Sequence, residues 1–158
     1  MRRKIVAGNW KLHGSKAFAA DLVTAIAAAM PAPDVDVVVL PPLPYLGELI
    51  ESFEAPGLLF GAQDVSANEK GAYTGEVSAG MLVDINARYG LVGHSERRQY
   101  HAESDALVAR KFIAAKHAGL VPILCVGESL HEREAGQTEY RIETQLAAIF
   151  SSSAERDR

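Results

Sequence analysis

Short apolar runs alternate with amphipathic segments along the whole chain, and this alternation restricts the folds that the chain can adopt. Five runs are compact, almost wholly apolar and flanked by turn-forming residues. They cover residues 4–8, 36–40, 58–62, 89–93 and 120–126. Uninterrupted apolar character predicts strands covered on both faces, because a half-exposed strand alternates apolar and polar side chains. The second run ends at Pro41 and Pro42, which lack amide donors and stop a strand ladder.

The amphipathic segments predict three long helices. Ser15 is placed to cap the first of them, and Pro31 and Pro33 set its end. Its apolar face repeats every four residues. That face consists of Phe18, Leu22 and Ile26.

Ser104 is placed to cap the second long helix, and Gly119 stands in its C′ position. The apolar face of this helix consists of Val108, Phe112 and Ala115. The apolar face of the third helix consists of Ile142, Leu146, Ile149 and Phe150. Shorter helices are expected over residues 45–53 and 77–86.

The spacing of the apolar runs predicts the fold class. Their starts lie roughly 22 to 32 residues apart, about one strand–helix unit each. Regular alternation of this kind predicts an α/β protein with a parallel sheet and right-handed crossovers. Two architectures fit: an open doubly wound sheet, or part of an eight-unit barrel that needs about 250 residues. For a single domain over residues 1–158, length alone favours the open sheet.

The end of the chain complicates that preference. Residues 151–158 are polar and contain no apolar closing element. They fit a frayed tail, and they also fit a helix-to-strand loop whose strand is missing.

Composition excludes several classes of protein. With 48% hydrophobic and 23% charged residues, the chain is neither disordered, collagen-like nor disulfide-stapled. Sixteen basic residues against twenty acidic ones, without a basic cluster, argue against a nucleic-acid partner. The apolar stretch near the N-terminus is too short for a signal peptide, and no run approaches a membrane span. A single cysteine, Cys125, requires no oxidising compartment, so a cytoplasmic protein without a membrane partner is expected.

In a parallel α/β protein, the side chains that act on a substrate follow the carboxyl ends of the strands. The expected strands are followed by residues 9–11, Gln63 and Asp64, residues 94–98, and residues 127–129. No dinucleotide-binding or phosphate-cradling glycine motif occurs, and no Cys or His spacing fits a metal site.

Lys11 and His94 are the strongest candidates among these residues for binding or acting on a substrate. Lys11 supplies a fixed positive charge for an anionic substrate, or it is a solvated surface lysine. His94 directly follows a strand, and Ser95 and Glu96 are placed to begin a helical turn. A helix N-terminus disfavours imidazolium, so a neutral ring could donate a hydrogen bond to a carbonyl group. The alternative is a histidine satisfied by local backbone.

The other candidates have structural explanations. Glu96 is a potential acid or base, but a first-turn carboxylate or an ion pair with Lys11 or an arginine is favoured. Cys125, late in an apolar run, is expected to be a small buried thiol rather than a nucleophile. Four further histidines are expected at the surface. They are His13, His101, His117 and His131.

Four segments at these strand ends resemble motifs of the triosephosphate isomerase family. Residues 7–12 (Ala-Gly-Asn-Trp-Lys-Leu) resemble its opening motif, and residues 71–78 (Gly-Ala-Tyr-Thr-Gly-Glu-Val-Ser) its third loop. Residues 92–98 (Val-Gly-His-Ser-Glu-Arg-Arg) resemble its electrophile motif, and residues 125–128 (Cys-Val-Gly-Glu) the end of its fifth strand. The motifs occur in the family's order with near-expected spacing.

The resemblance implies a fold and an activity. The fold is the (β/α)8 TIM barrel, of which this chain would supply about five strand–helix units, and this expectation replaces the preference based on length. The activity is the glycolytic and gluconeogenic interconversion of dihydroxyacetone phosphate and D-glyceraldehyde 3-phosphate by proton transfer through an enediolate, without a cofactor.

The resemblance also implies roles for single residues. Asn9 and Lys11 would hold the substrate, with Lys11 offsetting the charge of the phosphate and the enediolate. His94 would be the neutral electrophile, the role for which this family supplies the best-known example. Ser95 and Glu96 match positions beside the site, where Glu96 would pair with Lys11 or assist proton movement.

Supporting and dimer positions follow from the same motifs. Gln63, Arg97 and Cys125 match supporting positions, while Asp64 stands where the family commonly has asparagine. Residues 71–78 match a loop that inserts into a neighbouring subunit of a homodimer. Its expected contact residues are Tyr73 and Thr74.

One family motif is missing from these residues. No Tyr-Glu-Pro-Val-Trp-type segment occurs, so the glutamate base that this segment carries is absent. Because proton abstraction needs a base within hydrogen-bond reach, the 158-residue chain alone is expected to be inactive. The alternative is a non-enzymatic barrel fragment that acts only as a scaffold or association partner.

Overall fold

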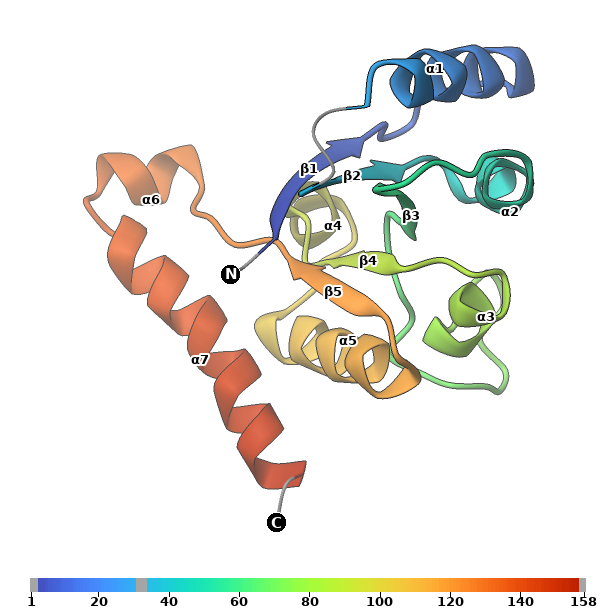
Figure 1. Ribbon diagram of the computed structural model, residues 1–158. Coiled ribbons are helices and arrows are strands. Elements are labelled where there is room, and N and C mark those ends of the chain that lie inside the picture. Colours follow the sequence, from blue (N-terminus) through green and yellow to red (C-terminus); the bar gives the residue numbers. More distant parts are fainter. Residues whose placement is uncertain (1–2, 31–33, 157–158) are drawn as a thin grey trace.

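The computed structural model describes residues 3–30 and 34–156 of the chain. Strands and helices alternate along it (Figure 1). In chain order the elements are β1 (Lys4–Asn9), α1 (Lys16–Ala28), β2 (Val35–Leu40), α2 (Leu43–Ser52), β3 (Leu58–Ala62), α3 (Ala79–Asp84), β4 (Tyr89–Val92), α4 (Ser95–Tyr100), α5 (Asp105–Ala118), β5 (Val121–Leu124), α6 (Leu130–Glu134) and α7 (Thr138–Arg156).

All five predicted strands and all five predicted helices are present in the described part of the chain. Ser15 and Ser104 cap α1 and α5 as predicted, each accepting a hydrogen bond from a backbone amide three residues on. Gly119 ends α5 in the left-handed region, with φ of 97°. The helix α1 ends at Ala28, while Pro31 and Pro33 lie outside the described residues.

Two expectations about helices need correction. The polar segment after Phe150 continues α7 as far as Arg156, so over that length it is neither a frayed tail nor a loop. Residues 157 and 158 lie outside the described part. The short helix α6 was not expected, although Ser129 and Glu132 form a capping box at its start.

The five strands form one parallel sheet in the order β1-β2-β3-β4-β5. Each strand therefore pairs with its neighbour in the chain, and crossovers of one hand then place the helices on one face of the sheet. Figure 1 shows the sheet curling, with helices along its outer side. A doubly wound sheet would need its strand order to reverse. The preference for an open sheet was wrong, and the partial (β/α)8 barrel is confirmed.

Side chains alternate between the two faces of the curled sheet. Val39 and Phe60 belong to the large core between the sheet and the helices. Val38 and Leu91 belong to a smaller apolar cluster on the opposite face. The strands β2, β3 and β4 are mostly buried, as their apolar character predicted.

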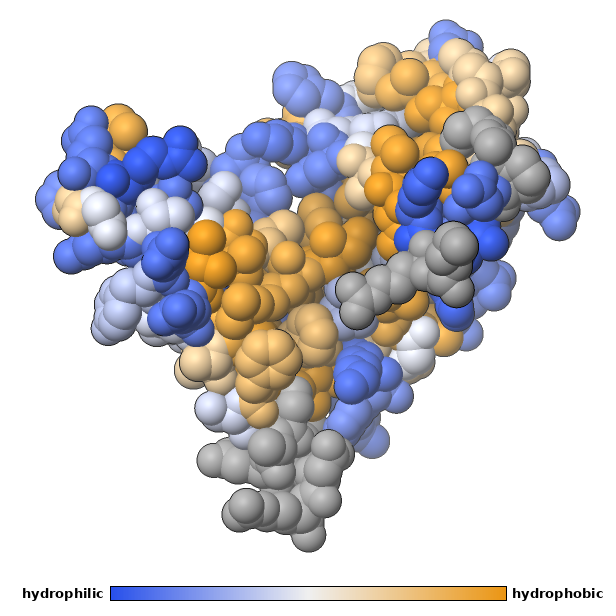
Figure 2. Space-filling model, turned by 60° about the vertical axis from the view of Figure 1, so that its left-hand side comes forward, coloured by the Kyte–Doolittle hydropathy of each residue, from blue (hydrophilic) through white to orange (hydrophobic). Residues whose placement is uncertain are grey.

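The expectation of burial on both faces was wrong for β5, in which no residue is fully buried, and for β1. Ile5 is 49% exposed and Val6 is 59% exposed. Among the described residues β1 pairs only with β2, and its side chains have few neighbours on either face. Apolar surface also gathers in a hollow on the face seen in Figure 2.

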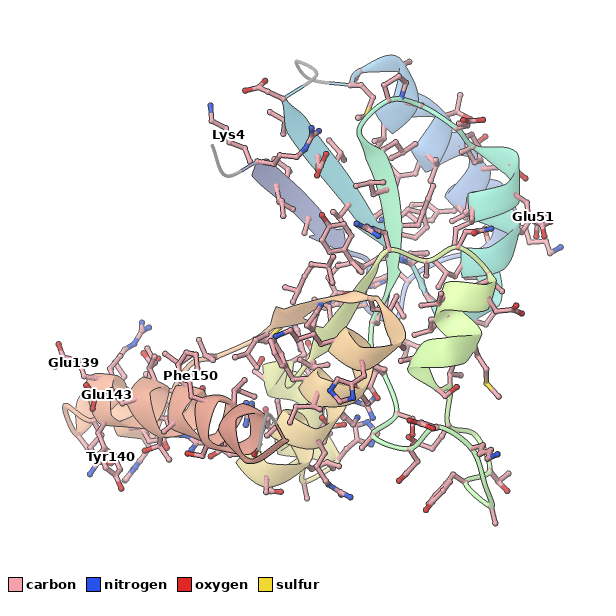
Figure 3. The ribbon with its side chains drawn as sticks, turned by 60° about the horizontal axis from the view of Figure 1, so that its bottom comes forward. Lys4, Glu51, Glu139, Tyr140, Glu143 and Phe150 are labelled. Atoms are coloured by element: carbon pink, nitrogen blue, oxygen red, sulfur yellow. The ribbon has the colours of Figure 1, made fainter. Side chains whose placement is uncertain are left out.

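The apolar faces of two long helices also differ from the prediction. In α1 the fully buried residues are Ala19 and Val23, whereas Phe18 is 45% exposed and stacks edge-on against Trp10. In α7 Ile149 is buried, while Phe150 is 68% exposed (Figure 3). No helix in the described part of the chain is long and apolar enough to cross a membrane.

Candidate functional site

Residues that follow the first four strands line one groove at the carboxyl ends of the sheet. The strand register brings these ends together, since Asn9 at the end of β1 lies opposite Leu40 at the end of β2. The groove has a volume of about 570 Å³. The predicted site residues that line it are Asn9, Lys11, Gln63, His94, Glu96 and Arg97.

Lys11 has a strained backbone that its neighbours hold in place. Its φ of 53° lies in the left-handed region, which non-glycine residues seldom adopt. The Lys11 amide donates to Asn9 Oδ1 at 2.9 Å, and Gln63 Nε2 donates to the Lys11 carbonyl at 3.0 Å. The same Gln63 nitrogen also donates to the Leu40 carbonyl at 2.8 Å. Strain maintained in this way is typical of functional sites, where it fixes the direction of a side chain.

The ammonium group of Lys11 pairs with the carboxylate of Glu96 across the groove. The Nζ–Oε1 distance is 2.7 Å, and both side chains are about half exposed. The hydrogen bond from Lys11 lowers the pKa of Glu96, so this carboxylate is ionised at neutral pH. The ion pair predicted from the sequence is therefore present.

His94 is the N-cap of α4, and its ring participates in the cap. Its Nδ1 accepts a hydrogen bond from the Glu96 amide at 3.3 Å. A nitrogen that accepts carries no proton, so the neutral ring carries its proton on Nε2. The carboxylate of Glu96 lies 3.6 Å from Nδ1, which is too long for a hydrogen bond. His94 can therefore donate from Nε2 without becoming charged.

The other predicted residues occupy different surroundings. Arg97 lines the groove and pairs with Asp64, whereas Ser95 at the start of the same helix is exposed. Cys125 is half-buried beyond the end of β5, and its amide donates to the Val92 carbonyl. Burial raises the pKa of the Cys125 thiol, which argues against a nucleophile.

Tyr73 and Thr74 do not line this groove. They lie at the exposed tip of the loop between β3 and α3, where Gly75 has a φ of 90°. The base of the loop is fixed, because Ser66 and Ser78 are buried and Ser78 caps α3. The tip therefore projects from a rigid base.

Several groove residues were missed as site residues. All four histidines predicted to be at the surface are exposed, but His13 and His101 also line the groove. Tyr100 lies beside them at the end of α4 and is 72% exposed. Their positions in the sequence could have predicted this placement. His13 closely follows β1, and α4 is too short to carry Tyr100 far from β4.

In the part of the chain that the structure describes, no group of three or more His, Cys, Asp or Glu residues could hold a metal ion. The groove instead offers a lysine cation, an imidazole whose Nδ1 accepts a backbone hydrogen bond, and amide groups. These groups can bind an anion and donate a hydrogen bond to a carbonyl oxygen.

Comparison with known proteins gives a consistent result. Residues 4–157 match the profile of the family described as "Triosephosphate isomerase". A triosephosphate isomerase of Xanthomonas campestris pv. campestris is 74% identical over 151 residues, which is 96% of this chain. Corresponding proteins of Xanthomonas axonopodis pv. citri and Stenotrophomonas maltophilia are 73% and 72% identical, over 96% and 95% of the chain. The chain spans 60% of the length of each of these three relatives.

Proposed function

Because the chain belongs to the triosephosphate isomerase family, we propose that its groove is the substrate site of an aldose–ketose isomerase. The reaction interconverts dihydroxyacetone phosphate and D-glyceraldehyde 3-phosphate through an enediolate. One proton moves between two adjacent carbons, and another moves between their oxygens. General acid–base groups and charge stabilisation are sufficient for this chemistry, so no cofactor is required.

Lys11 and Asn9 bind the substrate in this proposal. The Lys11 ammonium offsets the charge of the phosphate and of the enediolate, and its strained backbone directs it into the groove. Glu96 pairs with Lys11 in the absence of substrate. An entering anion has to share or replace that pairing, so Glu96 restrains Lys11 until substrate arrives.

His94 polarises the substrate carbonyl as a neutral hydrogen-bond donor. The observation that carries this role is the hydrogen bond from the Glu96 amide to His94 Nδ1, which leaves the proton on Nε2. A neutral donor can pass this proton to one oxygen and take another from its neighbour, without a stable imidazolium. Proton transfer of this kind between the two oxygens completes the isomerisation.

The glutamate base comes from outside these residues in our proposal. Glu96, the carboxylate that lines the groove beside His94, is already bound to Lys11, and no Tyr-Glu-Pro-Val-Trp-type segment occurs in the sequence. A polypeptide of these 158 residues alone is therefore expected to show no isomerase activity above background. Used alone, it would be a non-enzymatic barrel fragment. Turnover by the rigorously purified 158-residue polypeptide would contradict this expectation.

Tyr73 and Thr74 serve a homodimer in this proposal. Their loop projects from a fixed base, and Thr74 would meet Asn9 and Lys11 of a second subunit. The exposure of Tyr73, at 49%, supports a role in contact with a partner. Assembly would therefore be needed for full activity.

An extended version tests the proposal. In it, these residues are joined to the remainder of the Xanthomonas campestris relative, beyond the matched region. We expect this protein to isomerise both triose phosphates. His94→Gln should lower kcat by at least about a hundredfold with a much smaller change in KM, because the ring acts on the reacting oxygens. An extended version that folds and binds no triose phosphate would overturn the proposal.

A further inference from the structure

Four charged side chains form a closed ring at the wall of the groove, and two of them, Asp64 and Arg97, also line it. Lys111 Nζ lies 2.8 Å from both oxygens of Asp64 and 2.6 Å from Glu103 Oε1. Arg97 donates from Nε to Glu103 Oε1 at 2.7 Å and lies 2.9 Å from Asp64 Oδ2 through Nη2. Each cation therefore contacts both carboxylates, and the ring contains two positive and two negative charges.

The ring joins four separate segments around a buried centre. Asp64 follows β3, Arg97 lies in α4, Glu103 precedes α5 and Lys111 lies within α5. The side chains of Lys111 and Glu103 are only 4% and 3% exposed, so loss of a partner would leave a buried charge uncompensated. The Asp64 side chain is 23% exposed, and it lines the groove.

Two short paths connect Asp64 to the proposed catalytic residues. Gln63, its neighbour in the chain, donates to the Lys11 carbonyl at 3.0 Å. On the other side, the amide of Arg97 donates to the His94 carbonyl at 2.9 Å. Asp64 thus joins the segment that supports Lys11 to the first turn of the helix that carries His94.

We infer that Asp64 is a positioning residue that holds the Lys11 loop and the His94 helix at a fixed separation. It acts through its two contacts with Arg97 and Lys111, and it does not touch the substrate. A carboxylate suits this role because its two oxygens engage both cations at once. An amide has one acceptor oxygen and would present its NH2 group to the second cation.

The inference rests on the proposed function, and the extended version again provides the test. The variants are Asp64→Asn, Asp64→Ala and the control Asp36→Ala, which removes the ion pair between the buried Asp36 and the half-exposed Arg3 near the amino ends of β1 and β2. We expect kcat to fall about threefold for Asn and about tenfold for Ala, with KM within about twofold, because small misplacements slow chemistry more than binding. The control should lose stability with kcat unchanged.

Amide hydrogen exchange supplies a measurement that needs no activity. The amides of Arg97 and Arg98 both donate to the His94 carbonyl, and they should exchange faster in the Asp64 variants than in the control. If Asp64→Ala does not fold, the positioning role is tested by Asp64→Asn alone. Unchanged kcat together with unchanged exchange in Asp64→Asn would overturn the positioning role. An unsubstituted protein without isomerase activity would instead contradict the proposed function, while the exchange data would still test the contacts of Asp64.

Discussion

The side-chain amide of Gln145 makes hydrogen bonds with both the backbone amide and the backbone carbonyl of Gly127. Gln145 Nε2 donates to the Gly127 carbonyl at 2.9 Å, and the Gly127 amide donates to Gln145 Oε1 at 2.8 Å. Gln145 lies in α7 and is only 2% exposed, while Gly127 follows β5. The long last helix is therefore attached to the strand-end loops by a buried amide as well as by apolar contacts.

Replacing Gln145 by Leu should destabilise the extended version by about 1–3 kcal/mol, because two hydrogen bonds are lost at nearly constant volume. Thr144→Ala is the matched control, since its exposed hydroxyl donates only to the Tyr140 carbonyl in its own helix. Urea unfolding measures both free energies. Equal losses in the two variants would contradict the role of Gln145.

Gln145 also illustrates what the sequence could and could not predict. Apolar runs and capping residues predicted the strands and most helices because these signals are local to each segment. Gln145 and Lys111 are buried, and their partners lie outside their own helices, at Gly127 and at Asp64 and Glu103. Sequence position alone gives a polar residue on a helix no reason to be buried, so both were missed. The strand ends did bring Lys11 and His94 to one groove, because parallel strands end on the same side.

Lys11→Met should reduce kcat/KM of the extended version by much more than about tenfold. The methionine retains an apolar stem of similar length but removes the cation that, in the proposed function, faces the phosphate ester. Lys16→Met is the control, since Lys16 pairs with Glu48 in an exposed contact between α1 and α2. Steady-state kinetics with both triose phosphates provide the measurement. A loss of less than about tenfold would favour a solvated surface lysine at position 11.

Shortening the loop after β3 should convert a dimeric extended version into monomers with much reduced turnover. The deletion should replace residues 69–75 by a tight turn, because Val65, Ser66 and Ser78 are buried and Ser78 caps α3. Tyr73→Ser is a second variant, which removes the aromatic side chain without shortening the loop. Sedimentation gives the mass and a kinetic assay gives the rate. A shortened protein that remains dimeric would refute the role of this loop in assembly.

The last prediction concerns two aspartates whose titration should affect stability in opposite directions. Burial raises the pKa of Asp64 above its ordinary 3.8, even though Lys111 and Arg97 favour the charged form. The folded state therefore binds the Asp64 proton more tightly than the unfolded state does. Its contribution to stability is fully present below pH 3.8 and is lost as the pH rises through the folded pKa. Asp105 behaves differently: burial opposes its ionisation, but Arg141 and Arg98 outweigh burial and lower its pKa. Its contribution is present above 3.8 and is lost as the pH falls through the folded pKa.

Asp64→Asn should therefore gain stability relative to the parent as the pH rises from about 3 to about 7, and Asp105→Asn should lose it over the same interval. Chemical unfolding of the extended version at several pH values measures both differences. Asparagine matches the shape of the protonated aspartate, so each variant should approach the parent in acid. If the stability difference from the parent changed with pH in the same direction for both variants, burial would not be the main influence on the pKa of Asp64. A more stable Asp64→Asn with lower kcat would mean that the charge of Asp64 is retained for positioning at the expense of stability.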